Sequence, residues 1–167
     1  SGGVHGANRL GGNGVADSIV FGARAGDAMA EYVAKQELPS VSDAQVRELC
    51  EHWMQPMTRE TGENSFTVRE ALEDLMWEKV GVEKNAAGLR SALDDIEEIR
   101  LDVLPDMAIS TQSSIANYEW LDAIDVMNMV EVCELIVHSS LERKESRGPF
   151  IRTDFPATDN KKWLVAN

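Results

Sequence analysis

The chain has 167 residues, and its 16 basic and 29 acidic side chains give a formal net charge of −13. This length fits one domain, or one domain with a piece of another, and it can bury a sizeable core. The acidic balance argues against a nucleic-acid surface, because phosphate binding needs clustered Lys and Arg. No run approaches the roughly 20 apolar residues of a membrane span, and no signal peptide is recognisable. Cys50 and Cys133 lie far apart in no metal-type spacing, so we expect buried thiols in a reducing compartment, with a disulfide as the alternative.

Charge and glycine are distributed unevenly along the chain. Residues 1–36 are neutral overall, and 8 of the 12 glycines lie before residue 27. Residues 37–99 carry a net charge of −9, residues 100–139 carry −6, and residues 140–167 carry +2. We therefore expect an acidic middle domain whose flanking segments have a different environment.

The first 14 residues are predicted to form a loop, because so many glycines lose too much conformational entropy in a helix or strand. A helix is predicted from about Gly14 to Lys35, with Asn13 as a plausible N-cap. The segment Glu37-Leu-Pro-Ser40 is typical of a linker that ends this helix. Four small residues within the helix allow another backbone to approach closely: Gly22, Ala23, Ala25 and Gly26.

The middle of the chain is helical by its periodicity. Ser42 and Asp43 can cap a helix with one apolar face: Val46, Leu49, Cys50, Trp53, Met54 and Met57. Thr67 and Glu70 match a capping box, and the helix that follows them is predicted to end at Gly81. Its expected buried positions are Val68, Leu72, Leu75, Met76 and Val80.

Two further helices are predicted after Gly81. The first is expected to end at Pro105, and its apolar positions are Leu89, Leu93, Ile96, Val103 and Leu104. The second runs from about Asn117 to Arg143 and is polar only at every third position: Glu119, Asp122, Asp125, Asn128, Glu131 and Glu134. A helix that is polar along one narrow line is covered on most sides, so we place it at the centre of a bundle.

The tail has no helical or strand period, and Pro149 and Pro156 favour an extended course. Three of its aromatic side chains should lie against something folded: Phe150, Phe155 and Trp163. The predicted fold is all-α, an antiparallel bundle of three to four helices over residues 37–143. A glycine-rich loop and a helix precede the bundle in residues 1–36, and an extended tail follows it in residues 144–167.

The chemistry that the sequence offers lies mainly in the opening loop. There is no dinucleotide-binding or phosphate-loop glycine motif and no nucleophile elbow. The histidines stand in no metal-ligand spacing, so no metal site is predicted: His5, His52 and His138. Residues 11–14 lead directly into a helix, whose N-terminus favours a phosphate, a carboxylate or the anionic edge of a reduced flavin. Arg9 offers a planar donor for a carboxylate, although a purely structural role is the commoner one for such an arginine, and for His5 as well.

Residues 4–15, Val-His-Gly-Ala-Asn-Arg-Leu-Gly-Gly-Asn-Gly-Val, resemble the H-G-A-N-R-L-G-G-N-S-L segment of the succinate dehydrogenase/fumarate reductase flavoprotein family. The flavoproteins of L-aspartate oxidase and adenylylsulfate reductase are related to that family. Residues 69–72 and 76–82 resemble its R-E-x-L and M-W-x-x-V-G, and residues 141–156 resemble its E-S-R-G-A-H-x-R-x-D-F/Y-P. These matches occur in the right order over almost the whole chain, which makes the resemblance specific.

The resemblance implies FAD as cofactor and a C4 dicarboxylate as substrate of a full-length flavoprotein. Arg9 aligns with the arginine that binds a substrate carboxylate. Gly14 and Val15 align with a Ser-Leu pair whose backbone amides contact the flavin, and Asn13 precedes them as a third expected cofactor-binding residue. Because Gly14 stands where serine is usual, the backbone donor is kept and the hydroxyl is lost. Phe150 stands where histidine is usual, and no role is assigned to it.

The resemblance also divides the chain. It implies that residues 1–36 are the last loop and helix of an FAD-binding domain, residues 37–143 a helical domain, and residues 144–167 a tail that folds back. The family's dinucleotide fingerprint, its capping domain and the catalytic arginine of that domain come earlier in the sequence, so no catalytic residue is expected here. We therefore expect the C-terminal part of a flavoprotein that interconverts succinate and fumarate, inactive and without bound FAD by itself.

The implied partners are the FAD-binding and capping domains and an iron–sulfur subunit, with no nucleic acid and no membrane span. The implied location is cytoplasmic, or peripheral on the inner face of a membrane through partner subunits. The alternative is a non-catalytic helical assembly module, whose first helix exposes apolar side chains for a missing partner: Ile19, Val20, Phe21 and Met29. Such a chain should self-associate when isolated. The direction of the reaction and the electron acceptor stay open.

Overall fold

The computed structural model describes residue 5 and residues 9–164. Its helices are α1 (Asn13–Val33), α2 (Asp43–Met54), α3 (Ser65–Val80), α4 (Ala86–Glu98) and α5 (Tyr118–Glu142), with short helical turns η1 (Gln55–Thr58), η2 (Ile99–Val103) and η3 (Leu104–Asp106). Its strands are β1 (Glu63–Asn64), β2 (Glu83–Lys84), β3 (Met107–Ala108) and β4 (Ile151–Arg152). No helix of the described part is both long enough and apolar enough to cross a membrane.

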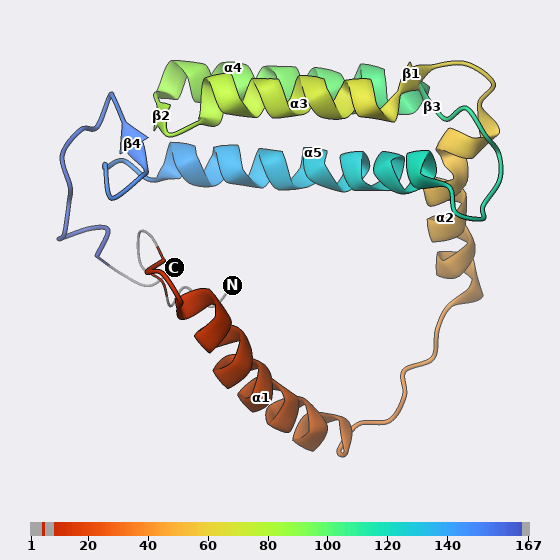
Figure 1. Cartoon of the computed structure of the whole chain (residues 1–167), viewed down its shortest axis with the longest axis horizontal. Coiled ribbons are helices and arrows are strands. Elements are labelled where there is room, and N and C mark those ends of the chain that lie inside the picture. The colour runs from red at the N-terminus through yellow and green to blue at the C-terminus, as the bar shows by residue number, and fades with distance from the viewer. Residues whose placement is uncertain (1–4, 6–8, 165–167) are drawn as a thin grey trace.

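Helices α3, α4 and α5 lie side by side and form the body of the molecule (Figure 1). The chain reverses direction from α3 to α4 and again from α4 to α5, so α3 and α5 run in the same direction (Figure 1). Strand β1 pairs with β3 and strand β2 with β4, both in parallel. The expectation of a purely all-α, antiparallel bundle is therefore corrected. The helical bundle is present, but two neighbouring helices are parallel, and short strand pairs join the segments at their ends.

The core lies between these three helices. One cluster, toward the C-terminal end of α3, contains Leu72, Val80, Leu89, Ala92, Ile96, Val130, Cys133 and Val137. A second cluster, at the other end, contains Met57, Val68, Met107, Ile109, Ala123 and Val126. The expected burial on the helix that ends at Gly81 is confirmed at Val68, Leu72 and Val80, and Leu75 and Met76 pack against the first cluster. Both cysteines are free thiols; Cys133 is buried as expected, and this burial raises its pKa.

The start of α3 differs from its prediction. Asn64, in an extended conformation, is the N-cap, and its side-chain oxygen accepts a hydrogen bond of 2.9 Å from the Phe66 amide. Thr67, expected as the first residue of a capping box with Glu70, already lies inside the helix. An asparagine three residues upstream therefore supplies the cap that the sequence pattern assigned to Thr67.

Other helix ends match their sequence signals. The Ser42 hydroxyl caps α2, the Asn117 side chain caps α5, and α3 ends at Gly81. The predicted third helix is interrupted, because α4 ends at Glu98 and the chain continues through the π-helical turn η2 and the 3₁₀ turn η3 that contains Pro105.

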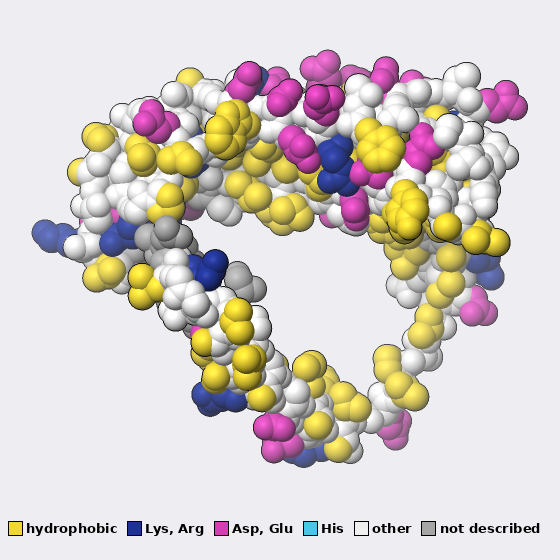
Figure 2. Space-filling view, in the orientation of Figure 1, with side chains coloured by type: hydrophobic (Ala, Val, Ile, Leu, Met, Phe, Trp, Pro, Cys, Tyr) yellow, Lys and Arg dark blue, Asp and Glu magenta, His cyan; other side chains and the backbone are white. Residues whose placement is uncertain are grey.

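Two helices contribute no buried side chain to the described structure: α2, for which one apolar face was predicted, and α1, for which exposed apolar side chains were predicted. Trp53 on α2 is half-buried. No side chain of α1 or α2 is buried, and Cys50 is exposed on α2, which contradicts the expectation of a core thiol. Helix α1 lies apart from the bundle, and residues 34–42 connect it to α2 (Figure 1). Hydrophobic side chains gather along α1 (Figure 2). The central helix α5 is likewise open on one side: Val132, Leu135 and Ile136 are exposed. The periodicity identified the apolar faces of α2 and α5, but the described residues do not cover these faces completely.

The packing predicted for the tail aromatic residues is found at Phe150 and Trp163, whereas Phe155 is 36% exposed and lies against Arg152 of the tail itself. The Lys84 ammonium lies 4.5 Å from the ring centre of Phe150, and the Arg143 guanidinium lies 5.2 Å from the ring centre of Trp163. Strand β4 pairs with β2, where the Thr153 amide donates to the Lys84 carbonyl at 2.9 Å. Burial and the nearby Arg152 charge lower the pKa of Lys84.

Candidate functional site

The glycine-rich loop turns into α1 at Gly12. Gly12 is the N-cap of the helix and has φ = 82°, a left-handed conformation that a glycine adopts without steric strain. It has no side chain with which to cap the helix. Asn13, expected as the N-cap, is instead the first residue of α1. The expectation fails because the turn requires a positive φ just before the helix, and Gly12 fits it better than Asn13.

Two backbone donors in the first turn of α1 have no acceptor among the described residues. The Asn13 amide donates to the Leu10 carbonyl, and the Ala16 amide donates to the Gly12 carbonyl, each at 3.3 Å. Within the described residues, the amides of Gly14 and Val15 have no acceptor. The first turn contains no acidic side chain, so nothing in it offsets the partial positive charge of the helix N-terminus.

The Arg9 side chain lies across this turn. A β-carbon built on Gly14 would be 3.1 Å from Nη1 of Arg9, which shows that the guanidinium rests against the glycine. In the described part of the chain, the guanidinium has no carboxylate partner. The structure thus brings Arg9, Asn13, Gly14 and Val15, the residues predicted to bind substrate and cofactor, into one turn of chain. The arrangement can receive an anion.

A histidine–aspartate pair adjoins this turn. His5 Nε2 lies 3.1 Å from the Asp17 carboxylate on the second turn of α1, and both side chains are about one-third exposed. The contact links the start of the loop to the helix. A structural role was expected for His5, but its partner was not predicted, because nothing in the spacing of the two residues indicates the contact.

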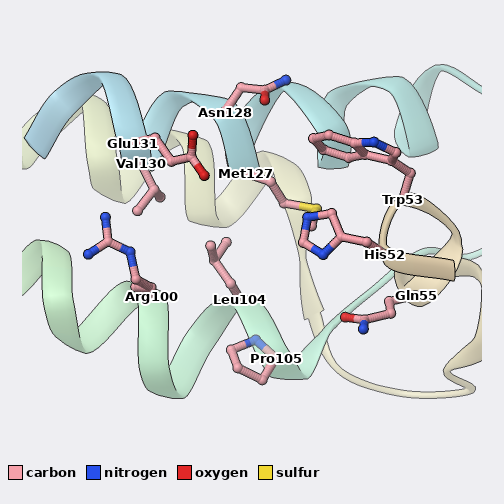
Figure 3. A pocket seen from close by; sticks show the side chains of 10 residues that line it. All are labelled: His52, Trp53, Gln55, Arg100, Leu104, Pro105, Met127, Asn128, Val130 and Glu131. Atoms are coloured by element: carbon pink, nitrogen blue, oxygen red, sulfur yellow. The ribbon is translucent and has the colours of Figure 1, made fainter. Parts of the chain in front are cut away.

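A cavity of about 300 Å³ lies elsewhere, between the end of α2, the turns η1 to η3 and α5 (Figure 3). The side chains of His52, Leu104 and Met127 point into it (Figure 3). None of the predicted site residues lines it. Its cation, Arg100, hydrogen-bonds Glu134 on α5, and this bond is the main cause of the lowered pKa of Glu134. Because this charge is already paired, the cavity offers less to an anionic ligand than the turn beside Arg9.

A buried ionic cluster holds the tail to the end of α5. The Glu145 carboxylate is fully buried and accepts hydrogen bonds from Arg143, Arg147 and the Asp159 amide. These bonds, led by those from Arg147, hold the pKa of Glu145 at about 2. The sequence resemblance includes this segment but implies no role for its charged residues. Their partners show that the role is structural.

Metal ligation has no candidate among residues 5 and 9–164, where no group of three His, Cys, Asp or Glu side chains is placed to hold an ion. The site is therefore defined by the loop and the first turn of α1.

A family model and individual relatives both match this chain. The family model described as "Fumarate reductase flavoprotein C-term" matches residues 69–167. The chain is 36% identical over 165 residues to an uncharacterized FAD-dependent oxidoreductase of Methanocaldococcus jannaschii, covering 98% of this chain and 29% of that protein. It is 38% identical over 161 residues to one of the subunits of the CoM/CoB fumarate reductase of Methanothermobacter marburgensis, covering 95% of this chain and 28% of that polypeptide.

Solved structures resemble the fold closely. A chain of the Mycobacterium smegmatis Sdh1 complex in the apo form superposes with a TM-score of 0.89 and 36% identity, over 95% of this chain and 27% of that chain. A chain of a quinol–fumarate reductase with menaquinol molecules superposes with a TM-score of 0.85 and 28% identity, over 96% of this chain and 28% of that chain. The sequence thus spans less than one third of the length of these proteins.

Proposed function

The chain belongs to the fumarate reductase/succinate dehydrogenase flavoprotein family of oxidoreductases, and from that premise we propose that it is the C-terminal part of an enzyme that interconverts succinate and fumarate. We call that whole enzyme the full-length flavoprotein. The observation that carries the proposal is the turn at the start of α1, where a cation and two available amides meet. Arg9 rests against Gly14, and the amides of Gly14 and Val15 have no acceptor within the described residues.

This turn fits one edge of a flavin. Two adjacent amides at an uncapped helix N-terminus favour an electron-rich ring edge, and Asn13 adds a polar side chain beside them. FAD, when bound, supplies the hydride transfer. Holding negative charge at that edge stabilises the reduced flavin, a task that backbone amides perform whatever side chain residue 14 carries.

Arg9 would bind and orient the substrate. Its guanidinium is a planar donor that can pair with a carboxylate through two hydrogen bonds. A dicarboxylate held at one end presents its central carbons in a fixed direction, which lowers the entropic part of the barrier. Proton transfer is assigned to no residue of this chain.

Three segments of the chain have different proposed roles. Residues 1–36 complete an FAD-binding domain, residues 37–143 form the helical domain, and residues 144–167 form the tail. The remaining FAD-binding and capping domains and an iron–sulfur subunit are the expected partners, with peripheral attachment to the inner face of a membrane through such subunits. The chain alone should bind no FAD, because most of a dinucleotide's contacts would be missing. Stoichiometric absorbance near 450 nm after incubation with FAD would contradict this.

The test of the function is Arg9→Ala in the full-length flavoprotein, beside Arg9→Lys. We expect both variants to keep their flavin and to lose activity, with a raised KM and a lowered kcat for succinate and fumarate. Arg9→Lys should be the milder, because it keeps the charge and loses the planar fork. Unchanged kinetics in Arg9→Ala would remove Arg9 from the site and defeat the assignment.

A second function, a non-catalytic assembly module, is favoured by one observation. Helix α1 buries no side chain against the described chain although Ile19, Phe21 and Met29 lie on it. The two proposals are compatible. An apolar helix that packs against the rest of a flavoprotein would also mediate self-association of the isolated chain.

A further inference from the structure

We propose that the absence of a side chain at residue 14 sets the position of the Arg9 guanidinium, and thereby the affinity of the site for a dicarboxylate. Gly14 is then a positioning residue that acts through Arg9. This inference rests on the proposed function, in which Arg9 binds a substrate carboxylate. It goes beyond the backbone role proposed for Gly14, which any residue could fill.

The contact is specific to this glycine. A β-carbon on Gly14 would lie 3.1 Å from Nη1, 3.3 Å from Cζ and 3.5 Å from Nε of Arg9, so it would meet three atoms of the same guanidinium. Ordinary contacts of carbon begin near 3.5 Å. At Gly11, Gly22 and Gly26 the same construction meets nothing within 4 Å. Of the glycines in the described loop and α1, Gly14 therefore shapes the site and these three do not.

The expected consequence is a change of position rather than of stability. Arg9 is exposed and its side chain is long, so it can move away from a new β-carbon by a few tenths of an ångström at little energetic expense. Gly14 also lies in the first turn of a helix, where alanine is at least as well tolerated as glycine. A variant with a side chain at residue 14 should thus fold normally and hold its substrate less well.

The test is a double-mutant cycle on the full-length flavoprotein with Gly14→Ala, Arg9→Ala and the double variant. The matched control is Gly88→Ala, which adds a β-carbon in the first turn of α4, where the nearest atom lies at 3.5 Å. For each variant we would measure flavin content, melting temperature, and kcat and KM for fumarate and succinate. We expect Gly14→Ala to raise KM by about three- to tenfold, since a displacement of 1 Å can reduce activity about a hundredfold. Its flavin content and melting temperature should not fall, and Gly88→Ala should match the wild type.

The cycle separates the inference from the function on which it rests. In the Arg9→Ala background, adding Gly14→Ala should change KM little, because the side chain through which residue 14 acts is gone. An equal fold-change in both backgrounds, or a loss of flavin in Gly14→Ala, would overturn the inference. So would an unchanged KM in Gly14→Ala while Arg9→Ala is impaired, and the proposed function would then survive. If Arg9→Ala itself leaves KM unchanged, both fail together.

Discussion

Arg147 binds Glu145 through two hydrogen bonds, from Nε to Oε1 at 2.8 Å and from Nη2 to Oε2 at 3.0 Å, and the glutamate is completely shielded from water. The same carboxylate accepts a bond of 2.6 Å from Arg143, just after the end of α5, and one of 2.8 Å from the Asp159 amide in the tail. One buried negative charge thus joins Arg143, just after the end of α5, to Asp159 in the tail, fourteen residues beyond Glu145. This joint is the part of the tail whose contribution is easiest to test.

Replacing Glu145 with Gln should destabilise the chain. The amide keeps the shape but removes the charge, and it turns one acceptor into a donor that faces arginine donors. Breaking a buried, charge-assisted pair in this way lowers the free energy of unfolding by about 2–4 kcal/mol. Urea unfolding followed by circular dichroism measures the change. Glu142→Gln is the control, since Glu142 is exposed and unpaired in the described structure, and it should stay within about 0.5 kcal/mol of the wild type.

Acid should weaken the same joint. The pKa of Glu145 is about 2 in the folded chain, against 4.5 as its ordinary value, and bonds from Arg152 hold the pKa of Asp154 at about 2, against 3.8. A carboxyl whose pKa is depressed by folding stabilises the folded state above its unfolded pKa, and that contribution is lost as the pH falls through the folded pKa. Stability should therefore decline between about pH 5 and pH 2.

The contribution of Glu145 to this decline can be isolated by comparison. The difference in unfolding free energy between wild type and Glu145→Gln should be largest near pH 7 and should shrink steadily below pH 4.5. Urea unfolding at several pH values gives that difference directly. A difference that is constant from pH 7 to pH 3 would show that the glutamate is not held ionised by its arginine partners.

Much of the helical domain was predictable because its signals are local. Helix α5 was expected from about Asn117 to Arg143 and runs from Tyr118 to Glu142, since its cap and its apolar period are written in neighbouring residues. The strands were not predictable. Each is two residues long, which is too short for any alternation, and each pairs with a segment more than forty residues away. The packing partner of each apolar helix face was not predictable either. An apolar face indicates that another segment packs against it, but its sequence does not identify that segment.

The candidate site divides in the same way. Arg9, Gly14 and Val15 come together because they lie within seven consecutive residues that turn into a helix, so reading the loop was enough. The approach of Arg9 to Gly14 depends on a side-chain rotamer, which no sequence pattern contains. The contact between His5 and Asp17 likewise joins residues twelve positions apart through the course of the loop.

Isolated copies of the chain should associate through α1. Its apolar side chains at Ile19 and Met29 are more than 60% exposed, and both lie on a helix that buries nothing in the described chain. An exposed apolar face of this kind drives contact between copies, with a favourable free energy that scales with the area removed from water. Sedimentation velocity over a hundredfold range of concentration should show a rising average mass.

Ile19→Glu combined with Met29→Glu should return the chain to a monomer, because charge at both positions opposes burial. Gln36→Glu together with Gln45→Glu adds the same charge at exposed polar positions and should leave association unchanged. A wild-type chain that stays monomeric at every concentration would mean that α1 does not mediate self-association.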